Sequence, residues 1–418
     1  MTLSHSPLGD TKPVASPSAE RRAISDFGQI VLVFQGGGAL GAYQIGVYEA
    51  LHEAGVEPDW VIGTSIGAIN AALVAGNAPQ DRLPRLEEFW SRVEHSGLLG
   101  LMSGAPGIGG IFANMATIAT GLPAFFKPNP FAFLSAHAPL GAEAAGYYST
   151  APLEATLADL VDLELLNGGA PRLTVGAAKV ATAEMRYFDS RDTRLTLKHI
   201  LASGALPPAF PAVRIDGDLY WDGGVLSNTP VEAIFDDMPR RDSIIFAVHI
   251  WRSHGAEPGT IWEVMSRQKD LQYSSRAVSH IARQKQIHRL RHIITALAER
   301  LPKSAREDPE VRALASYGCV TTMHVVRLVA PMVDGDDHTK DIDFSRAGIR
   351  RRRQAGREDT LRILERKPWT APHDPLDGFV LHQPELEPLD GRARPIAMPG
   401  IDQRSTPAIP HAKTISRS

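Results

Sequence analysis

The sequence predicts an α/β fold with a mostly parallel central sheet. Residues 30–34 (Ile-Val-Leu-Val-Phe) form a continuous apolar run, which is typical of a strand buried on both faces. A helical pattern follows, and a second apolar run at 60–62 is followed by a helix of small residues at 68–75. This alternation of strand, glycine-containing loop and helix indicates a doubly wound sheet.

Composition and periodicity divide the rest of the chain. Strands are expected at 172–180, 185–188 and 243–251. A long amphipathic helix is expected at 261–301, then a strand at 321–329 and a basic helix at 345–366. We therefore predict a disordered lead over 1–28, a catalytic α/β domain over 29–250 with an apolar insertion at about 96–148, a mostly helical C-terminal extension over 251–370, and a Pro-rich, largely irregular tail over 371–418.

The overall charge excludes some classes of function. Lys and Arg number 44 against 47 Asp and Glu, so no global positive field favours a nucleic-acid partner. Cys319 is the single cysteine, which rules out an intrachain disulfide. The N-terminus has no apolar segment of the kind that a signal peptide needs, and the predicted location is cytoplasmic.

Residues 96–126 contain no charged side chain, which raises the question of a membrane span. Pro106, Pro123 and several glycines divide the segment, whereas a spanning helix needs about 20 continuous apolar residues. We predict no transmembrane helix here. The segment is interpreted as a packing insertion, with a lipid-entry flap as the alternative, and peripheral contact with a membrane stays open.

Ser65 is the candidate nucleophile. It lies in Gly63-Thr64-Ser65-Ile66-Gly67, between an apolar strand and a helix, which matches the G-x-S-x-G elbow. Such a turn holds the serine in a strained conformation at the top of the sheet. Gly63 and Gly67 are expected because a Cβ at either position would collide with the neighbouring strand or helix. The alternative is a closely packed glycine corner without a catalytic role.

The loop Gly36-Gly37-Gly38-Ala39-Leu40-Gly41 ends the first strand, and its N–H groups suit either a phosphate or an oxyanion. A dinucleotide site would place an acidic residue at the end of the second strand, but Asp59 precedes that strand. A P-loop would require Lys-Ser/Thr after the glycines, and the sequence has none there. Adjacent strands ending in this loop and in the serine turn favour acyl transfer.

A serine nucleophile needs a base, and two types of residue are candidates. Asp222 follows a strand-like Leu-Tyr-Trp run and precedes Gly223 and Gly224, which would let its carboxylate approach another backbone; a plain hairpin turn fits equally well. A Ser-Asp-His arrangement would need His249 or His254. His249 falls inside a predicted buried strand, where a packed core histidine is the more frequent outcome.

Taken together, these motifs resemble the patatin-like phospholipase family. The G-G-G-x-x-G loop from Gly36 to Gly41, the G-x-S-x-G elbow with Ser65 29 residues after Gly36, and the D-G-G motif from Asp222 match in order and spacing. The strings 41–51, 63–71 and 203–211 are also similar, so the resemblance covers about residues 30–234. The family often has Arg or Lys where this sequence has Leu40.

The resemblance implies a three-layer α/β/α sandwich and a Ser65–Asp222 dyad without histidine. It also implies an oxyanion hole from Gly36, Gly37 and Gly38, and hydrolysis of lipid or phospholipid acyl esters with no metal or cofactor. The C-terminal extension resembles one found on some bacterial members. Alternatives are an acyltransferase or Ser-Asp-His esterase on the same site, or a non-catalytic lipid-binding protein.

Two further groups of residues receive a structural interpretation. His280, His288 and His292 share a predicted helix, but without an H-E-x-x-H pattern we expect no zinc site. Arg350 to Arg353 are expected to form a solvated helix face, with an anionic lipid surface as the alternative.

Overall fold

The computed structural model describes residues 24–94, 119–134, 137, 139–333 and 336–383, without the side chains of 133–134 and 275–278. Within them nine strands form one sheet in the order β11-β10-β9-β1-β2-β5-β8-β7, with β6 also paired to β5. From β11 to β5 all neighbours are parallel, whereas β6, β7 and β8 are antiparallel to theirs. The strands are β1 (Gln29–Phe34), β2 (Trp60–Thr64), β5 (Arg172–Lys179), β6 (Glu184–Asp189), β7 (Val213–Ile215), β8 (Asp218–Asp222), β9 (Ser243–His249), β10 (Met323–Val329) and β11 (Phe379–His382).

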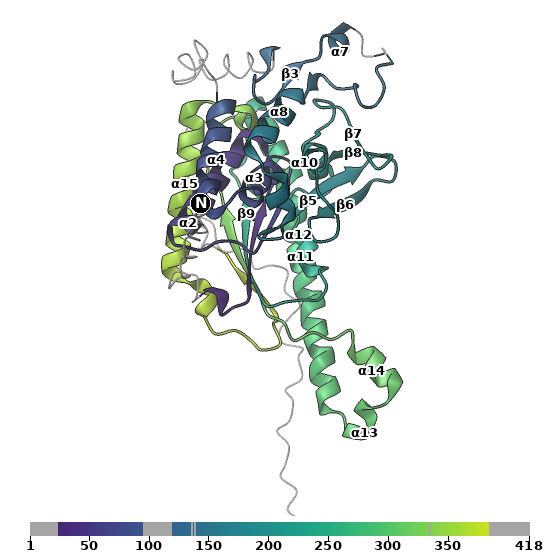
Figure 1. Cartoon of the computed structure of the whole chain (residues 1–418). Helices are drawn as coiled ribbons and strands as arrows, with labels where there is room; N and C mark the ends of the chain where they lie inside the picture. The colour runs from purple at the N-terminus through teal and green to yellow at the C-terminus, as the bar shows by residue number, and fades with distance from the viewer. Residues whose placement is uncertain (1–23, 95–118, 135–136, 138, 334–335, 384–418) are drawn as a thin grey trace, which may run out of the picture. The chain divides into compact units, whose positions relative to one another are not determined.

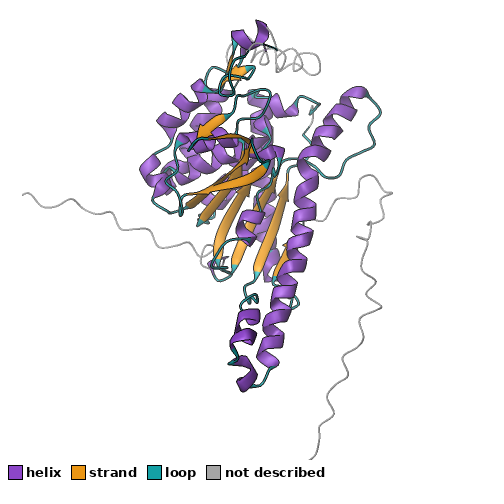
Figure 2. Ribbon diagram, turned by 90° about the vertical axis from the view of Figure 1, so that its right-hand side faces the viewer, coloured by secondary structure: helices purple, strands orange, loops and turns teal. Residues whose placement is uncertain are grey.

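Helices cover both faces of the sheet, which confirms the predicted three-layer α/β/α arrangement (Figure 2). Strand β1 explains the continuous apolar run: Leu32 and Phe34 join the core on one face, while Val31 and Val33 join the core on the other. The first face is covered by α2 (Ala42–Glu53), α3 (Ile66–Ala75), α4 (Pro79–Val93), α8 (Ala151–Leu160), α10 (Leu197–Ser203) and α15 (Arg346–Arg366), and the second by α11 (Glu232–Phe235) and α12 (Ile261–Arg300).

The segment after β9 is mixed in structure. Helix α12 begins with a capping box at Thr260, where the sequence places its start, and continues past the sheet to the short helices α13 (Lys303–Arg306) and α14 (Pro309–Ala315) (Figure 1). The expected strand and basic helix appear as β10 and α15. Strands β10 and β11 then extend the same sheet beside β9, and β11 falls within the predicted tail. The predicted domain boundaries stay predictions.

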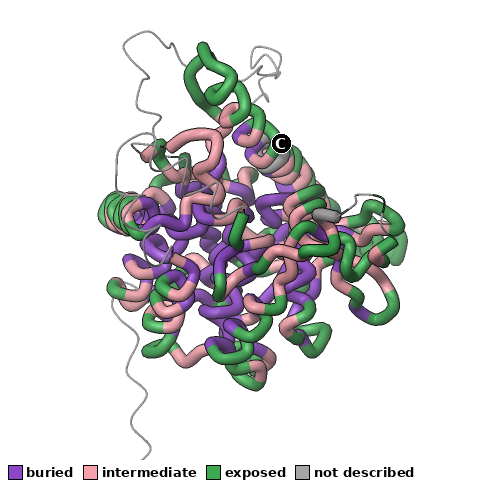
Figure 3. The backbone as a smooth tube through the Cα atoms, turned by 90° about the horizontal axis from the view of Figure 1, so that it is seen from above, coloured by how far each residue is buried: buried purple, intermediate pink, exposed green. Residues whose placement is uncertain are grey.

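The rim above the carboxyl ends of the strands contains the described part of the insertion, while residues 96–118 of it lie outside the described residues. It comprises β3 (Lys127–Pro128), α7 (Pro130–Leu134) and β4 (Tyr148–Ser149). Buried segments concentrate in the sheet and the helices against it (Figure 3). In the part of the chain that the structure describes, no helix is both long and apolar enough to span a membrane.

Candidate active site

Ser65 occupies a strained turn between β2 and α3. Its backbone has φ 57° and ψ −127°, a left-handed conformation that a non-glycine residue adopts at a cost of about 1–3 kcal/mol. A Cβ at Gly63 would lie 2.3 Å from the Gly67 carbonyl oxygen, and one at Gly67 would lie 2.3 Å from the Phe34 carbonyl oxygen. The turn is therefore closed by backbone-to-backbone contacts that only glycine permits.

Strand register brings Asp222 to this turn. The last residue of β2, Thr64, pairs with Gly176 of β5, and Asp222, the last residue of β8, pairs with Ala177, the next residue of β5. Because β2 is parallel to β5 and β8 is antiparallel to it, the two strands approach each other end to end. Ser65 and Asp222 meet where they converge, and both line one cavity.

The end of α10 holds both backbones in place. The Ser65 N–H donates to the Ser203 carbonyl at 3.1 Å, and the Asp222 N–H donates to the Ala205 carbonyl at 2.9 Å. The Ser203 hydroxyl in turn donates to the Gly176 carbonyl at 2.6 Å, which ties this segment to β5. One short stretch of chain therefore sets the separation of the two candidate catalytic residues.

The Asp222 carboxyl is almost fully buried, with 2% of its surface exposed. Burial raises the pKa of Asp222 to about 7, while the hydrogen bonds it accepts from the Ser65 side chain and from the Gly224 N–H (2.7 Å) oppose that rise. No Lys, Arg or His among the described residues lines the cavity to offset the loss of water. A carboxyl with a pKa near neutrality is suited to general base catalysis.

The cavity has a volume of about 300 Å³ and mostly apolar walls. Ring centroids of Phe126 lie 4.9 Å from Tyr148 and 5.7 Å from Phe210, and those of Phe125 and Phe344 lie 5.9 Å apart. Phe125 and Phe126 belong to the segment 96–126 that the sequence marks as uncharged. The walls therefore suit an acyl chain, and Ser65 and Asp222 are among the few polar residues that line them.

The glycine loop lies against Ser65, the candidate nucleophile. Gly36, Gly37 and Gly38 line the cavity, and a Cβ at Gly36 would lie 2.9 Å from the Ser65 Cβ. The Gly36 N–H, however, donates to the Asn228 carbonyl at 3.2 Å. Of the three loop glycines in the predicted oxyanion hole, Gly36 therefore has an N–H that is already engaged, whereas Gly37 and Gly38 donate to no backbone carbonyl among the described residues.

The remaining motif glycines serve close packing. A Cβ at Gly41 would lie 2.7 Å from the Ile66 side chain, and one at Gly223 would lie 2.5 Å from the Gly176 carbonyl oxygen. Gly224 lines the cavity and donates to Asp222. Gly41 is therefore required by the close approach of the turn after Ser65, and Gly223 and Gly224 by the close packing at the end of β8.

Residues from the C-terminal region complete the cavity, and no sequence motif marks them. Tyr273, Ile342 and Phe344 line it, together with Trp251 and Asn228. Their positions follow from long-range packing, for which the sequence spacing offers no signal.

Two crossed ion pairs bind the turn η3 (Lys340–Ile342) to α12. Lys269 pairs with Asp341 at 2.7 Å and Lys340 pairs with Asp270 at 2.8 Å. The Asp341 carbonyl in turn packs against Gly38, because a Cβ there would lie 2.2 Å from it. The C-terminal segment is thereby held against the glycine loop.

His249, His288 and His292 occupy structural positions. No described histidine lines the cavity. His249 is 2% exposed, and burial followed by the nearby Arg327 charge holds its pKa well below the usual range. His288 and His292 both bond the Thr321 carbonyl, at 2.8 and 2.9 Å. Among described residues no group of three or more His, Cys, Asp and Glu is arranged to hold a metal ion.

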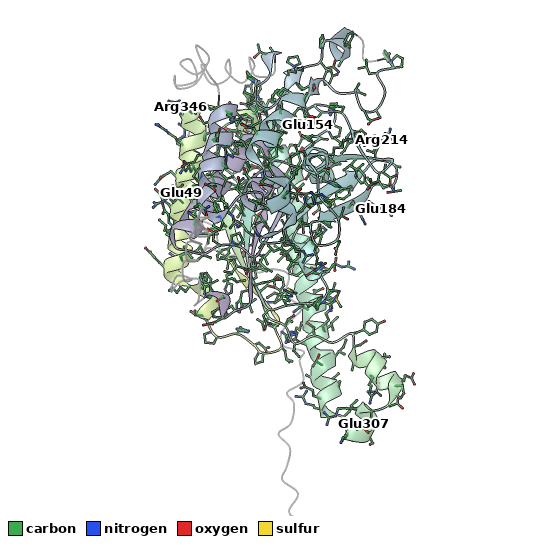
Figure 4. The ribbon with its side chains drawn as sticks, viewed as in Figure 1. Glu49, Glu154, Glu184, Arg214, Glu307 and Arg346 are labelled. Atoms are coloured by element: carbon green, nitrogen blue, oxygen red, sulfur yellow. The ribbon has the colours of Figure 1, made fainter. Side chains whose placement is uncertain are left out.

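The expected basic face of α15 is only half solvated. Arg350 and Arg351 are exposed, but Arg352 is 3% exposed and pairs with Asp336 at 2.7 Å. Arg353 pairs with Glu49 of α2 at 2.7 Å, on the side of the molecule where Figure 4 labels Glu49 and Arg346. The prediction of a solvated face was wrong for Arg352, because an arginine can be buried once a carboxylate compensates its charge.

A strained G-x-S-x-G turn and a neighbouring glycine loop on a mostly parallel sheet match the arrangement found in α/β hydrolases. The family model described as patatin-like phospholipase matches residues 32–235, and the model described as patatin phospholipase matches residues 271–376. The chain belongs to the patatin-like phospholipase family. Membership supports a lipid hydrolase, and the resemblance seen in the sequence is confirmed.

Individual relatives match short segments. Lysophospholipase nte1 of Aspergillus terreus is 57% identical over 47 residues, which is 11% of this chain and 3% of that protein. Patatin-like phospholipase domain-containing protein 6 is 46% identical over 63 residues in both Mus musculus and Homo sapiens, covering 15% of this chain and 5% of the relative. The chain thus matches a small part of these proteins. The structure of VipD from Legionella pneumophila aligns with a TM-score of 0.35 and 15% identity over 81% of this chain and 67% of VipD.

Proposed function

We propose that the protein is a serine esterase that cleaves carboxylic esters of lipids, of the phospholipase A or esterase type, through a Ser65–Asp222 dyad and an acyl-enzyme. The observation that carries the proposal is the placement of a strained serine beside a buried carboxyl whose pKa is about 7, in one apolar cavity. Family membership and the names of the relatives support a lipid as the substrate.

The reaction begins when the Ser65 hydroxyl attacks the ester carbonyl and its proton passes to Asp222. The N–H groups of Gly37 and Gly38 stabilise the tetrahedral oxyanion, joined by the N–H of Ile66 at the unpaired start of α3. Each such donor contributes about 3–4 kcal/mol to lowering the barrier. Asp222 then gives its proton to the leaving alcohol, and water deprotonated by Asp222 releases the fatty acid.

The acyl chain lies along the aromatic wall of the cavity. A volume of about 300 Å³ is at the lower end of the range for small-molecule sites. The walls are mostly apolar and carry no positive side chain among the described residues, so apolar contact favours the acyl part of the substrate.

The direct test is labelling with a fluorophosphonate probe, followed by hydrolysis of a panel of p-nitrophenyl esters and phospholipids. Labelling is expected for the wild type and for the control S316A, whose serine is exposed on the surface, and not for S65A.

For the base, D222N is compared with D218N, a change in the same strand at a half-exposed carboxylate. The proposal fails if S65A is still labelled, or if D222N and D218N hydrolyse esters equally well.

A third arm separates the dyad from a Ser-Asp-His triad. Since His249 is buried and does not line the cavity, H249Q is expected to keep its labelling as long as it stays folded. Loss of labelling in a folded H249Q would favour the triad.

A further inference from the structure

The carbonyl group of Gly36 is held by two side chains. Trp251 Nε1 donates to it at 2.7 Å and Asn228 Nδ2 donates to it at 2.9 Å. The Gly36 N–H is also engaged, by the Asn228 carbonyl at 3.2 Å. Both backbone groups of this residue are therefore fixed on the side of the loop that faces Asn228 and Trp251.

This arrangement determines where the next N–H points. In a trans peptide, the carbonyl of one residue and the N–H of the following residue point in opposite directions. A Gly36 carbonyl turned toward Trp251 and Asn228 therefore turns the Gly37 N–H the other way, and Gly36 and Gly37 both line the cavity beside Ser65.

The fixation is needed because the peptide lies between two glycines. Glycine populates many more backbone conformations than other residues, so an unrestrained Gly36–Gly37 peptide can rotate. A rotated peptide would present its carbonyl oxygen to the cavity, where it would repel an oxyanion instead of binding it.

Trp251 is itself firmly placed. Its ring lies under the loop, since a Cβ at Gly37 would lie 2.7 Å from Nε1. It is 3% exposed and packs against Tyr273 at a centroid distance of 4.9 Å. The backbone N–H of Trp251 donates to the Gln35 side-chain oxygen at 3.0 Å, and the Gln35 side-chain amide donates to the Thr229 hydroxyl at 2.8 Å. The donor is thus anchored to the strand from which the glycine loop emerges.

We propose that Trp251 and Asn228 are positioning residues that lock the Gly36–Gly37 peptide with the Gly37 N–H directed at the substrate oxygen. The proposal rests on the ester-hydrolase function above. It assigns a role in catalysis to an indole N–H that is bonded to the Gly36 carbonyl of the glycine loop.

The test uses W251F, which keeps an aromatic ring and removes the N–H. W60F is the matched control. Trp60 lies at the start of β2, and this substitution also removes one buried indole hydrogen bond, which Trp60 donates to Thr174 at 2.8 Å. We expect kcat for a p-nitrophenyl ester to fall about tenfold in W251F with KM unchanged, and to stay near the wild-type value in W60F. N228A, which removes the second donor, is expected to behave like W251F.

A pair of inhibitors distinguishes this role from a general loss of packing. An alkyl trifluoromethyl ketone forms a tetrahedral oxyanion on the serine, whereas an alkyl methyl ether of equal length only fills the cavity. In W251F the affinity for the ketone should fall about tenfold more than the affinity for the ether, because both ligands meet the altered wall but only the ketone forms an oxyanion. An equal loss of affinity for both inhibitors, or no loss of affinity for either, would overturn the proposal. A wild type that hydrolyses no ester would instead remove the proposed function itself.

Discussion

Gly46 of α2 lies directly against the backbone of Arg353 in α15: a Cβ at Gly46 would be 1.8 Å from the Arg353 carbonyl oxygen. The contact is reciprocal, because a Cβ at Gly356 of α15 would lie 2.1 Å from the Tyr43 carbonyl oxygen of α2. Two glycines therefore let the N-terminal and C-terminal regions of the chain pack with backbone against backbone.

Replacing Gly46 by alanine is expected to force α2 and α15 apart. Since neither contact is the flexible end of a side chain, G46A should lower the free energy of unfolding by about 3 kcal/mol, the upper part of the range for overpacked cores. Urea denaturation measures the change. G259A is the control, because a Cβ there meets only Glu263 Oε2 at 3.6 Å; equal stability of the two variants would contradict the prediction.

The Asp222 carboxyl predicts a pH-dependent activity. Because its pKa is about 7 and the ionised form is the base, kcat/KM should rise with pH through an apparent pKa near 7. The profile is measured with an ester whose own chemistry is insensitive to pH. A limb near the ordinary pKa of an aspartic acid, about 4, would contradict the assignment.

The same carboxyl predicts a cost in stability. Its pKa is raised in the folded state, so the folded protein holds a proton that the unfolded chain releases, and stability falls as the pH rises from about 4 to about 7. With about 1.4 kcal/mol for each pH unit of displacement, D222N should be more stable than the wild type at pH 8 by up to about 4 kcal/mol. The difference should shrink at pH 5. Denaturation at both pH values tests this, and a pH-independent difference would contradict it.

Phe344 is expected to set the length of acyl chain that the cavity accepts. It lines the cavity and stacks on Trp90 at a centroid distance of 6.0 Å. F344L leaves the wall apolar but shorter, so kcat/KM should shift toward longer p-nitrophenyl esters. F246L, which shortens a core phenylalanine packed on Trp369, should reduce stability with no change in chain-length preference. Identical profiles for the two variants would exclude Phe344 as a determinant.

Arg172 is expected to hold the start of β5. It pairs with Asp189 at 2.8 Å and Asp237 at 3.0 Å, and its guanidinium lies 3.7 Å over the Trp60 ring. R172M would leave two buried carboxylates with weakened compensation, which should cost about 3–5 kcal/mol. The control R194M removes a surface pair with Glu164 and should change stability by less than about 1 kcal/mol. Calorimetry of both variants measures these changes in stability, and equal changes in R172M and R194M would contradict the prediction.

The sequence predicted those features that depend on residues close to one another in the chain. The apolar run at 30–34, the turn at Ser65 and the start of α12 at Ile261 all appear where the sequence places them. Each depends on neighbouring residues: burial on both faces, glycines around a tight turn, and a Thr-Glu capping box.

The features that were missed depend on distant partners. Asn228 and Trp251 contact Gly36 across 192 and 215 residues of sequence, and no spacing rule marks them. Strand β11 is too short and too close to prolines to be recognised without β10 beside it. The buried Arg352 looked like part of a surface run because its compensating Asp336 and Asp343 precede the helix.

The order of strands in the sheet also determines how the chain must fold during synthesis. Gln29 of β1 pairs with Ser243 of β9, which the ribosome adds 214 residues later. At about 5–20 residues per second, β1 and the glycine loop wait roughly 10–40 s for this neighbour. During that time the nascent chain carries an apolar strand whose edge toward β9 is unpaired. A chaperone that binds this edge would have to dissociate before β9 can pair and the cavity can form.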